Sequence, residues 1–445
     1  MQEQILISKA QNIRSVIKYI QQFKNAIIVI YIDDEIIYSP LFSSHIRDIS
    51  LIHQAGIKVA IVPGCRKRID QILSNSKIQW KYENDIRITC EEAIPLIKMA
   101  AFDTSNIVMT SLAANQITAT IGNWVRARAK GVIEGIDFGT AGEIDKLQTD
   151  SIKNILQNGF IPIFPCIGWS STGKPYNISS ITLAQEVAIA LKADKLFFLM
   201  NDEEISSKYF KIPAEIGLSE EEKVPAMNLE EVEHFINSNS FSEHKKILKL
   251  LQTSINACKK GVSRIHIING KFDGAIPCEI FSELGSGTMI YSSNYENIRS
   301  MVQQDIPSVL SLMRPFVKEK ILLSRTEDEL SNNINDYIVY EIDNNIRACA
   351  AIHFYSIEKQ SEIYAVAVDE SFSKLGIGPK LIQFLMKKSI KNGFFNIFLL
   401  TTRTSDWFEK LGFKPDSVDS IPQERKAIWT SKRNSKVLRL KLNEN

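Results

Sequence analysis

The sequence has few cysteines and few histidines, and neither type is spaced for metal binding. The six cysteines, at positions 65, 90, 166, 258, 278 and 349, include no Cys-x-x-Cys pair, so neither a zinc site nor a disulfide framework is indicated. The six histidines show no ligand spacing either. We therefore expect no metal site, and thiols that stay reduced.

An excess of one charge is also missing, and so are long apolar runs. The 445 residues hold 53 Lys and Arg against 51 Asp and Glu, a balance that gives no long-range field to attract nucleic acid or an acidic membrane. No apolar run reaches membrane-spanning length, and residues 1–23 lack the continuous apolar stretch of a signal peptide. These absences predict a cytoplasmic protein that binds neither nucleic acid nor membrane.

The first 290 residues alternate strand-like and helix-like segments. β-Branched runs at 26–32 and 57–62 flank a helix-like segment at 44–55 that is followed by Gly56, which is a βαβ pattern. The pattern predicts an α/β fold, an open and mostly parallel sandwich, over residues 1–290. Its further elements are expected at 160–164, 183–193, 196–200 and 262–268.

A second, smaller domain is expected from 296 to 445, because the chain is too long for one ordinary core. The polar, turn-rich stretch 291–297 marks the seam. The residues that follow predict an α/β domain with a mixed sheet. Its expected elements are a helix at 298–320, a hairpin at 337–354, and strands at 362–369, 396–402 and 437–442.

A glycine turn between the strand at 362–369 and a following helix is the first candidate site. Gly376 and Gly378 bracket the point where the helix must begin, and Pro379 suits its first turn. Glycines let backbone N–H groups approach an anion, and the helix dipole adds partial positive charge there. The turn is either a pyrophosphate cradle or a simple tight connection.

The segments that follow this turn favour the cradle. The strand at 396–402 runs into RTSDWFEKLGF at 403–413, and here the chain resembles the GNAT superfamily of acetyl-CoA-dependent N-acetyltransferases, although Ser373 replaces the usual first residue of the loop. The resemblance implies acetyl-CoA as co-substrate, held by backbone groups of the strand and the turn. The residues implied are Val366, Ala367, Val368, Lys374, Leu375, Gly376, Ile377, Gly378 and Pro379.

The first 290 residues resemble the amino acid kinase family through segments such as GKPYNIS at 173–179 and GVSRIHIINGKFDGAIPCEIF at 261–281. The catalytic features of a kinase are replaced, however. The first strand leads into Asp33 and Asp34 instead of a lysine and a glycine loop, and these carboxylates would repel ATP. The second glycine loop has become Gly64-Cys65-Arg66, and Ile181 stands where an aspartate is expected. We expect no phosphoryl transfer.

A kinase-like domain without kinase residues, placed ahead of a GNAT domain, resembles the bacterial N-acetylglutamate synthase family. LTTRTSDWFEKLGF at 400–413 and KRNSKVL at 432–438 carry this resemblance. It implies acetyl transfer from acetyl-CoA to L-glutamate, the first step of arginine biosynthesis. Two alternatives stay open: a catalytically weak protein that senses amino acids, and a GNAT acetyltransferase that acts on another amino acid.

Acetyl transfer needs a group that takes the amine's proton and one that protonates the leaving thiolate. Glu362, at the start of the cradle strand, is the candidate for the first task. Many GNAT enzymes use a tyrosine for the second, but that position here is Phe408. Thr401 and Thr402, at the end of the next strand, are therefore the candidate proton donors.

The two carboxylates of glutamate need guanidinium and hydroxyl partners. Arg433 and Ser435 lie two residues apart at a strand entry and can face one pocket. The resemblance points to the same two residues and to Arg314, and Arg403 is a further candidate.

Regulation is the last expectation drawn from the resemblance. Relatives that respond to arginine assemble as rings, typically hexamers, through an N-terminal helix, and here an amphipathic helix is expected at 8–23. They bind arginine beside a turn that corresponds to GSGTMI at 285–290. In those relatives an acidic residue precedes the first glycine of this turn. Here Leu284 stands at that position, and Glu283 lies one position earlier. We predict a homo-oligomer in which arginine inhibition is weak or absent, with Glu283 as a substitute carboxylate.

Overall fold

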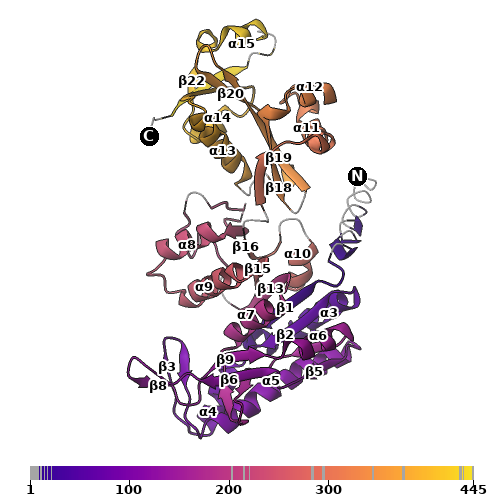
Figure 1. Cartoon of the computed structure of the whole chain (residues 1–445), viewed down its shortest axis with the longest axis vertical. Coiled ribbons are helices and arrows are strands. Elements are labelled where there is room, and N and C mark those ends of the chain that lie inside the picture. The colour runs from indigo at the N-terminus through magenta and orange to yellow at the C-terminus, as the bar shows by residue number, and fades with distance from the viewer. Residues whose placement is uncertain are drawn as a thin grey trace. The chain divides into compact units, whose positions relative to one another are not determined.

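The computed structural model of the chain divides into two compact units (Figure 1). The N-terminal unit comprises residues 1–213 and 221–292, and the C-terminal unit comprises 214–220 and 293–445. The structure describes residues 10–442, except 11–12, 15, 18, 22, 202–203, 214–215, 220, 282–284, 293–295, 343–344, 373–375, 430–432 and 434. Seven of the 16 residues in the helix expected at 8–23, and the residues Glu283 and Leu284, therefore lie outside the described residues.

The N-terminal unit is built on an eight-stranded sheet with the order β14-β16-β15-β13-β1-β2-β10-β5. Every neighbouring pair is parallel except β15 with β16, which confirms the predicted open, mostly parallel architecture. The strands are β1 (Ile27–Ile32), β2 (Lys58–Pro63), β5 (Ala119–Ile121), β10 (Ile161–Ile163), β13 (Lys195–Met200), β14 (Ala226–Asn228), β15 (Arg264–Asn269) and β16 (Thr288–Tyr291).

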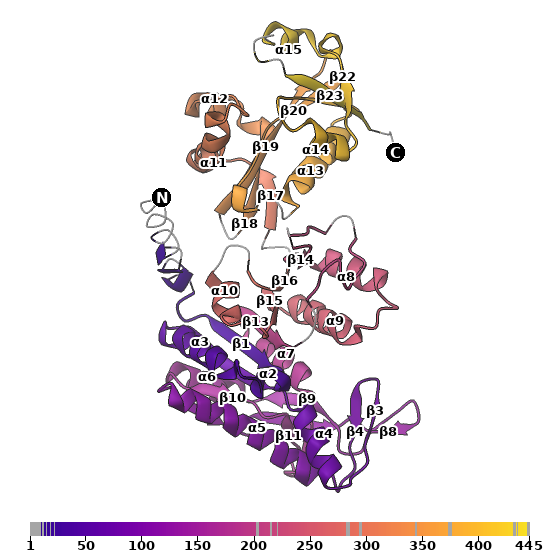
Figure 2. The ribbon, with the colours of Figure 1, turned by 180° about the vertical axis from the view of Figure 1, so that it is seen from behind.

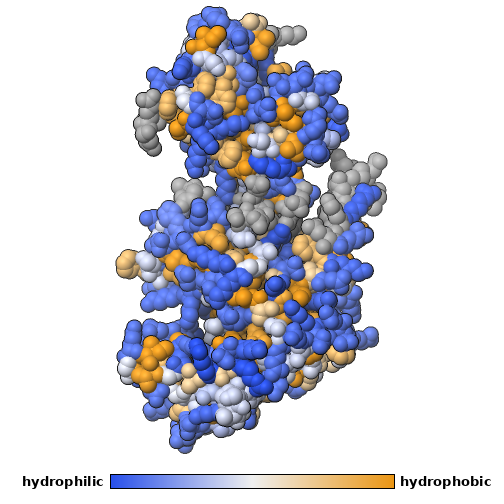
Figure 3. Space-filling view, in the orientation of Figure 1, coloured by the Kyte–Doolittle hydropathy of each residue, from blue (hydrophilic) through white to orange (hydrophobic). Residues whose placement is uncertain are grey.

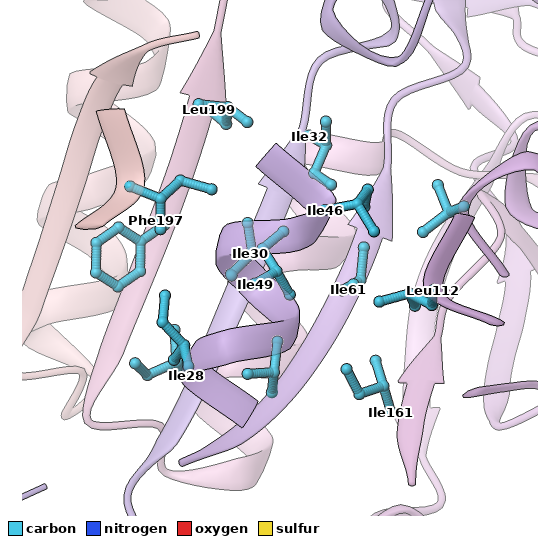
Figure 4. Close-up of a cluster of buried hydrophobic side chains, with 14 of the residues drawn as sticks. Ile28, Ile30, Ile32, Ile46, Ile49, Ile61, Leu112, Ile161, Phe197 and Leu199 are labelled. Carbon is cyan, nitrogen blue, oxygen red and sulfur yellow. The ribbon is translucent and has the colours of Figure 1, made fainter. Parts of the chain in front are cut away.

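Helices cover this sheet. Alternate residues of β1, Ile28, Ile30 and Ile32, are buried against Ile46 and Ile49 of α3 (Figure 4), as expected for a strand in a doubly covered sheet. Helix α7 packs on β1 and β2 and lies in front of them in Figure 1, whereas α3 is in front in Figure 2. The helices are α2 (Asp34–Ile37), α3 (Phe42–Gln54), α4 (Arg66–Asn75), α5 (Ile94–Ala114), α6 (Thr149–Gln157), α7 (Ser180–Leu191), α8 (Leu229–Ser238), α9 (Lys245–Lys259) and α10 (Ala275–Phe281).

Smaller β-structures complete this unit. A four-stranded sheet has the order β12-β11-β6-β9, and two hairpins pair β3 with β4 and β7 with β8. The strands are β3 (Lys81–Glu83), β4 (Ile86–Ile88), β6 (Val125–Ala129), β7 (Val132–Ile133), β8 (Ile136–Asp137), β9 (Gly142–Leu147), β11 (Ile167–Trp169) and β12 (Pro175–Asn177).

The C-terminal unit contains a seven-stranded mixed sheet with the order β17-β18-β19-β20-β21-β23-β22. Only β20 and β21 pair in parallel, which confirms the predicted mixed sheet. The strands are β17 (Glu296–Ser300), β18 (Tyr337–Ile342), β19 (Asn345–Tyr355), β20 (Gln360–Val368), β21 (Asn396–Thr401), β22 (Lys414–Asp416) and β23 (Lys436–Lys441).

Two groups of helices sandwich this sheet. Helices α11 and α12 pack on one face with Val339, Cys349 and Ala367, and α13 packs on the other with Ile352 and Ile363 (Figures 1 and 2). The helices are α11 (Ile306–Lys318), α12 (Glu327–Asn332), α13 (Ile377–Lys391), α14 (Ser405–Lys410) and α15 (Gln423–Ala427). Short 3-10 turns lie at Gln303–Asp305, Ile334–Asp336, Glu370–Phe372 and Val418–Ser420.

The helix expected from residue 298 begins later than predicted. Residues 296–300 form β17 instead, with Ile298 opposite Tyr340 of β18. Arg299 donates to Glu341 on β18 and to Asp305, which fixes this segment at the edge of the sheet. The helix α11 starts at Ile306, with Pro307 in its first turn, as proline's missing N–H allows.

The surface is largely polar on the face shown in Figure 3, where apolar residues form only small groups. Among the residues described, no helix has the length and apolar character that crossing a membrane requires.

Candidate active site

A bulge in β20 shapes the centre of the C-terminal unit. The ladder with β19 pairs Ala351 with Tyr364 but Cys349 with Ala367, so β20 carries one extra residue between these pairs. Ala365 accordingly has a φ of 55°, a left-handed conformation that costs a residue with a Cβ atom roughly 1–2 kcal/mol. A strained backbone held in place by its surroundings is a feature of functional sites.

The strands β20 and β21 separate just before this bulge. Their parallel pairing runs from Gln360 with Asn396 to Ile363 with Leu399 and stops there. The backbone from Tyr364 to Val368 consequently has no β-ladder partner on its β21 side in the described structure. This open strand edge includes Val366, Ala367 and Val368, the residues predicted to hold the pantetheine arm of acetyl-CoA.

The glycine turn after β20 forms the start of α13 as predicted. Gly376 has a φ of 71° and precedes Ile377, the first helical residue. At Gly378, an added Cβ would lie 2.8 Å from the Trp407 ring, so this glycine is needed for packing as well as for the proposed pyrophosphate contact. Ser373, Lys374 and Leu375 lie outside the described residues.

The two aromatic residues of α14 differ in exposure. Phe408 is buried in the core below α13, next to Phe413, whereas Trp407 is partly buried and packs edge-on against Phe408. Phe408 therefore has a structural place in the core, and Trp407 is the aromatic residue that reaches the glycine turn.

Glu362 is buried, and both of its carboxylate oxygens accept hydrogen bonds. Arg425 Nε donates to both its carboxylate oxygens, at 2.8 and 2.9 Å, and the Tyr355 hydroxyl donates to Oε2 at 2.9 Å. Only 5% of Glu362 is exposed. Burial, followed by the nearby charge of Glu362, raises the pKa of Tyr355, so this phenol remains a donor to the carboxylate. The prediction that Glu362 takes a proton from the amine stays a prediction.

The two threonines at the end of β21 have different surroundings. Thr401 Oγ1 accepts from the Thr404 backbone N–H at 3.1 Å and shares a hydrogen bond of 2.8 Å with the Thr404 hydroxyl. The Thr402 hydroxyl is buried without a hydrogen-bond partner. Of the two predicted donors, Thr402 has the unused hydroxyl.

Two further arginines act electrostatically on Arg433, a predicted ligand of the acceptor. Arg433 Nη2 donates to the Ile321 carbonyl at 2.7 Å, and burial together with the charges of Arg325 and Arg425 lowers the Arg433 pKa. Arg325 also lies over the Tyr364 ring, 5.4 Å from its centroid. Ser435 is half-buried beside Arg433 in the chain. This arginine group creates a positive site suited to a substrate with more than one carboxylate.

The other two predicted acceptor ligands lie elsewhere. Arg314 is exposed on α11, and Arg403 is exposed with Glu319 at 4.0 Å; neither is among the charges that shift the Arg433 pKa. Sequence reasoning missed Arg325 and Arg425. Arg325 comes from the loop before α12 and Arg425 from the short helix α15, neither carries a motif, and only the fold brings their charges to Arg433.

In the N-terminal unit, the carboxylates of Asp33 and Asp34 lie where the resemblance to the kinase family predicts a phosphate site. Asp33 caps α2 and pairs with Lys246 at 3.0 Å. Asp34 Oδ2 accepts from the Lys67 backbone N–H at 2.5 Å, in the first turn of α4. Burial and the neighbouring charge of Asp33 raise the Asp34 pKa to about 6. The chain's own anion thus occupies a helix N-terminus that could otherwise hold a phosphate.

The turn before β16 is organised by a buried glutamate that the sequence did not single out. Glu279 Oε2 accepts from the backbone N–H groups of Ser286, at 2.5 Å, and Gly287, at 2.8 Å. Its other oxygen lies 2.6 Å from His266 Nδ1. Gly285 has a φ of 71°, and a Cβ there would meet Glu279. Glu279 therefore supplies a carboxylate directly beneath this turn.

Within the described part of the chain, no three His, Cys, Asp or Glu side chains gather so as to hold a metal ion. The six cysteines all lie in the described part of the chain and form no disulfide there.

Comparisons with known proteins match both units. Residues 7–269 match the amino acid kinase family, and residues 333–415 match the acetyltransferase (GNAT) domain. An amino-acid acetyltransferase of Actinobacillus pleuropneumoniae is 31% identical over 431 residues, covering 96% of this chain and 97% of the relative. One from Vibrio vulnificus is 32% identical over 433 residues, covering 95% and 96%.

Solved structures agree with these matches. N-acetylglutamate synthase from Neisseria gonorrhoeae, complexed with coenzyme A and L-arginine, has a TM-score of 0.78 at 27% identity and covers 98% of this chain and 99% of its own. The same enzyme complexed with coenzyme A and N-acetyl-glutamate has a TM-score of 0.61 at 28% identity, with the same coverage. The chain therefore belongs to the amino-acid acetyltransferase family, as an enzyme that joins a unit of the amino acid kinase family to a GNAT acyltransferase unit.

Proposed function

We propose that the protein transfers the acetyl group of acetyl-CoA to the amine of L-glutamate and releases N-acetyl-L-glutamate and CoA, as the first step of arginine biosynthesis. The observation that carries this proposal is the group of Arg325, Arg425 and Arg433, in which the half-buried Arg433 is held by the Ile321 carbonyl and feels the charges of the other two, in the same unit as the open edge of β20. Such a group favours an acceptor with two carboxylates. The Neisseria enzyme, solved with coenzyme A and N-acetyl-glutamate, supports the choice.

The open edge of β20 and the glycine turn each bind a different part of acetyl-CoA. Backbone groups of Val366 to Val368 hold the pantetheine arm and polarise the thioester carbonyl. The N–H groups at the start of α13, from Gly376 to Pro379, take the pyrophosphate with the helix dipole, and Lys374 and Leu375 extend this loop.

Side chains bind the acceptor and exchange protons with the amine and the leaving thiolate. Arg433 and Ser435 bind the carboxylates of glutamate, joined by Arg325; Arg314 and Arg403 are weaker candidates because both are exposed. Glu362 stands as the sequence-based candidate for proton removal. Thr402, ahead of Thr401, donates a proton to the CoA thiolate.

Release of free thiol from acetyl-CoA tests the function. Purified protein is incubated with acetyl-CoA and, in turn, glutamate, glutamine, aspartate, ornithine and lysine. Glutamate is expected to give the highest kcat/KM. A different preferred amine would reassign the substrate within the same chemistry, and thiol release with none of them would favour a sensing protein.

Regulation by arginine and self-assembly complete the proposal. We infer a homo-oligomer, a hexamer by resemblance, in the cytoplasm. The site for arginine is the turn at Gly285–Gly287, where Glu279 supplies a buried carboxylate in addition to the one expected from Glu283. Half-inhibition at micromolar arginine would overturn the expectation of weak or absent inhibition, and Glu279→Gln should then relieve it.

A further inference from the structure

Tyr364 is the first residue of the open edge of β20. The parallel ladder with β21 ends one residue earlier, at Ile363, and the positive φ of the bulge follows one residue later, at Ala365. Tyr364 pairs with Ala351 of β19, and its side chain packs with the core cluster below α11 and α12. The backbone of Tyr364 therefore starts the edge proposed for acetyl-CoA, whereas its ring lies on the α11 side of the sheet.

Two neighbouring side chains hold the ring of Tyr364 in place. Tyr337 packs edge-on against it, with ring centroids 5.7 Å apart, and only 1% of Tyr337 is exposed. The Tyr364 hydroxyl donates to Asp336 Oδ2 at 3.1 Å, and His353 Nδ1 lies 2.8 Å from the same oxygen. Burial raises the pKa of Tyr364, so the phenol stays a donor. A ring fixed at its edge and at its hydroxyl presents its face in a constant direction.

Arg325 lies over this ring. Its Cζ atom is 5.4 Å from the ring centroid of Tyr364, within the range of a cation–π contact. Arg325 Nη1 donates to the Leu323 carbonyl at 3.1 Å, and Arg325 pairs with no carboxylate in the part of the chain that the structure describes. A contact with a ring uses none of the N–H donors of a guanidinium, so these donors remain available to a carboxylate. Arg325 is thus positioned without being neutralised.

The second arginine, Arg433, is supported in a similar way. Its guanidinium donates to the Ile321 carbonyl at 2.7 Å and feels the positive charge of Arg325. Both carbonyl partners, Ile321 and Leu323, belong to the loop between α11 and α12. Because like charges repel, two guanidinium groups held by neutral partners favour the entry of an anion that pairs with both.

We propose that Tyr364 is a positioning residue of the acceptor site: its ring, fixed by Tyr337 and Asp336, holds Arg325 where a carboxylate of the acceptor meets it. Since the backbone of Tyr364 starts the edge that binds acetyl-CoA, one residue sets the position of the acceptor carboxylate relative to the thioester. The inference rests on the proposed acetyl transfer to glutamate and adds to it the residue that orients the acceptor.

A double-mutant cycle of Tyr364→Leu and Arg325→Ala, measured by thiol release in the full chain, tests this role. Tyr364→Leu should raise the KM for glutamate by about 3–30-fold, with the KM for acetyl-CoA within about twofold of wild type. Tyr364→Phe keeps the ring and should keep the KM for glutamate within about threefold of wild type. In the Arg325→Ala background, Tyr364→Leu should change the KM for glutamate no further, because no guanidinium is left to position.

Tyr82→Leu is the matched control. Tyr82 also donates to an aspartate, Asp70, at 3.1 Å and lies under an arginine, Arg66, whose Cζ atom is 4.1 Å from the ring centroid. It belongs to the N-terminal unit, so its replacement should change neither KM. The unfolding temperature is recorded for each variant, because Tyr364→Leu also removes packing. A lower unfolding temperature without a change in the KM for glutamate would make Tyr364 a purely structural residue.

The remaining outcomes also decide the inference. An equal rise in the KM for glutamate with and without Arg325 would overturn it. If another amine is the better substrate, the cycle is run with that amine and judged by the same criteria. If the wild type releases no thiol with any amine, the proposed function fails. Calorimetric titration of glutamate in the presence of CoA then judges the positioning role alone, and a Kd unchanged by Tyr364→Leu would overturn it.

Discussion

At the scale of single residues, Asp34 links stability to pH. Folding raises its pKa from 3.8 to about 6 through burial and the charge of Asp33, so the folded protein holds this proton more tightly than the unfolded chain. Stability therefore falls as pH rises from about 4 to about 6, and the full loss remains above that range. Asp34→Asn should stabilise the N-terminal unit at pH 7.5 by roughly 1–3 kcal/mol, and little at about pH 3.5, below both pKa values. Thermal unfolding at the two pH values checks this, and an equal gain at both would contradict it.

Arg433 provides a residue-scale test of the acceptor site. Arg433→Ala should raise the KM for glutamate by about 10–100-fold, the loss of a charged hydrogen bond of about 1.5–3 kcal/mol, with little change for acetyl-CoA. Arg47→Ala is the control, because Arg47 is exposed on α3 of the N-terminal unit. Steady-state kinetics with each substrate varied decide the outcome; a shift confined to acetyl-CoA would remove Arg433 from the acceptor site.

The two threonines at the end of β21 can be told apart by removing one hydroxyl at a time. Thr402→Val should lower kcat without lowering stability, because the Thr402 hydroxyl has no partner to lose. Thr401→Val should cost about 1–2 kcal/mol of stability through its bonds to Thr404, with a smaller kinetic effect. Measured kcat and unfolding midpoints distinguish them, and the reverse pattern would make Thr401 the donor.

At the scale of elements, the start of α13 joins cofactor binding to packing. Gly378→Val should raise the KM for acetyl-CoA and leave that for glutamate nearly unchanged, because a branched side chain fills the space expected to hold pyrophosphate. It should also destabilise the unit, since even a Cβ atom would lie 2.8 Å from Trp407. The double variant Gly378→Ala, Trp407→Leu separates these effects: stability should recover while the KM stays high. If acetyl-CoA affinity were unaffected in both variants, the pyrophosphate would have to bind elsewhere.

The sequence could predict those elements that depend on neighbouring residues, and it missed those that depend on residues far away in the chain. The β-branched run of β1 and the Gly376 turn depend on neighbouring residues, and both formed where expected. The bulge at Ala365 was not predictable, because alanine carries no signal for a positive φ and the extra residue shows only against β19. The edge strand β17 was missed because its partner, β18, lies about forty residues further along the chain.

The candidate site follows the same rule. Arg433 and Ser435 could be named from one short segment, whereas Arg325 and Arg425 act on Arg433 only because the fold brings a loop and the helix α15 close to it.

At the scale of the whole molecule, the kinase-like unit should show no kinase activity. Asp34 occupies the first turn of α4, and Asp33 pairs with Lys246, so the groups that would meet a phosphate are already bound to carboxylates. ATP with N-acetylglutamate should yield no ADP above a protein-free control, as measured by a coupled assay. Protein-dependent ADP formation would show that another site performs the chemistry.

The separation of β20 from β21 has a consequence for how the backbone of the enzyme responds when CoA binds. A strand edge without a neighbour exchanges its amide hydrogens with solvent readily, and the pantetheine arm, which carries amides of its own, can add to that edge as a missing strand does. Deuterium uptake over residues 364–368 should slow when CoA binds, while the paired start of β20 at Gln360–Ile363 stays protected throughout. Ligand binding would then complete the sheet.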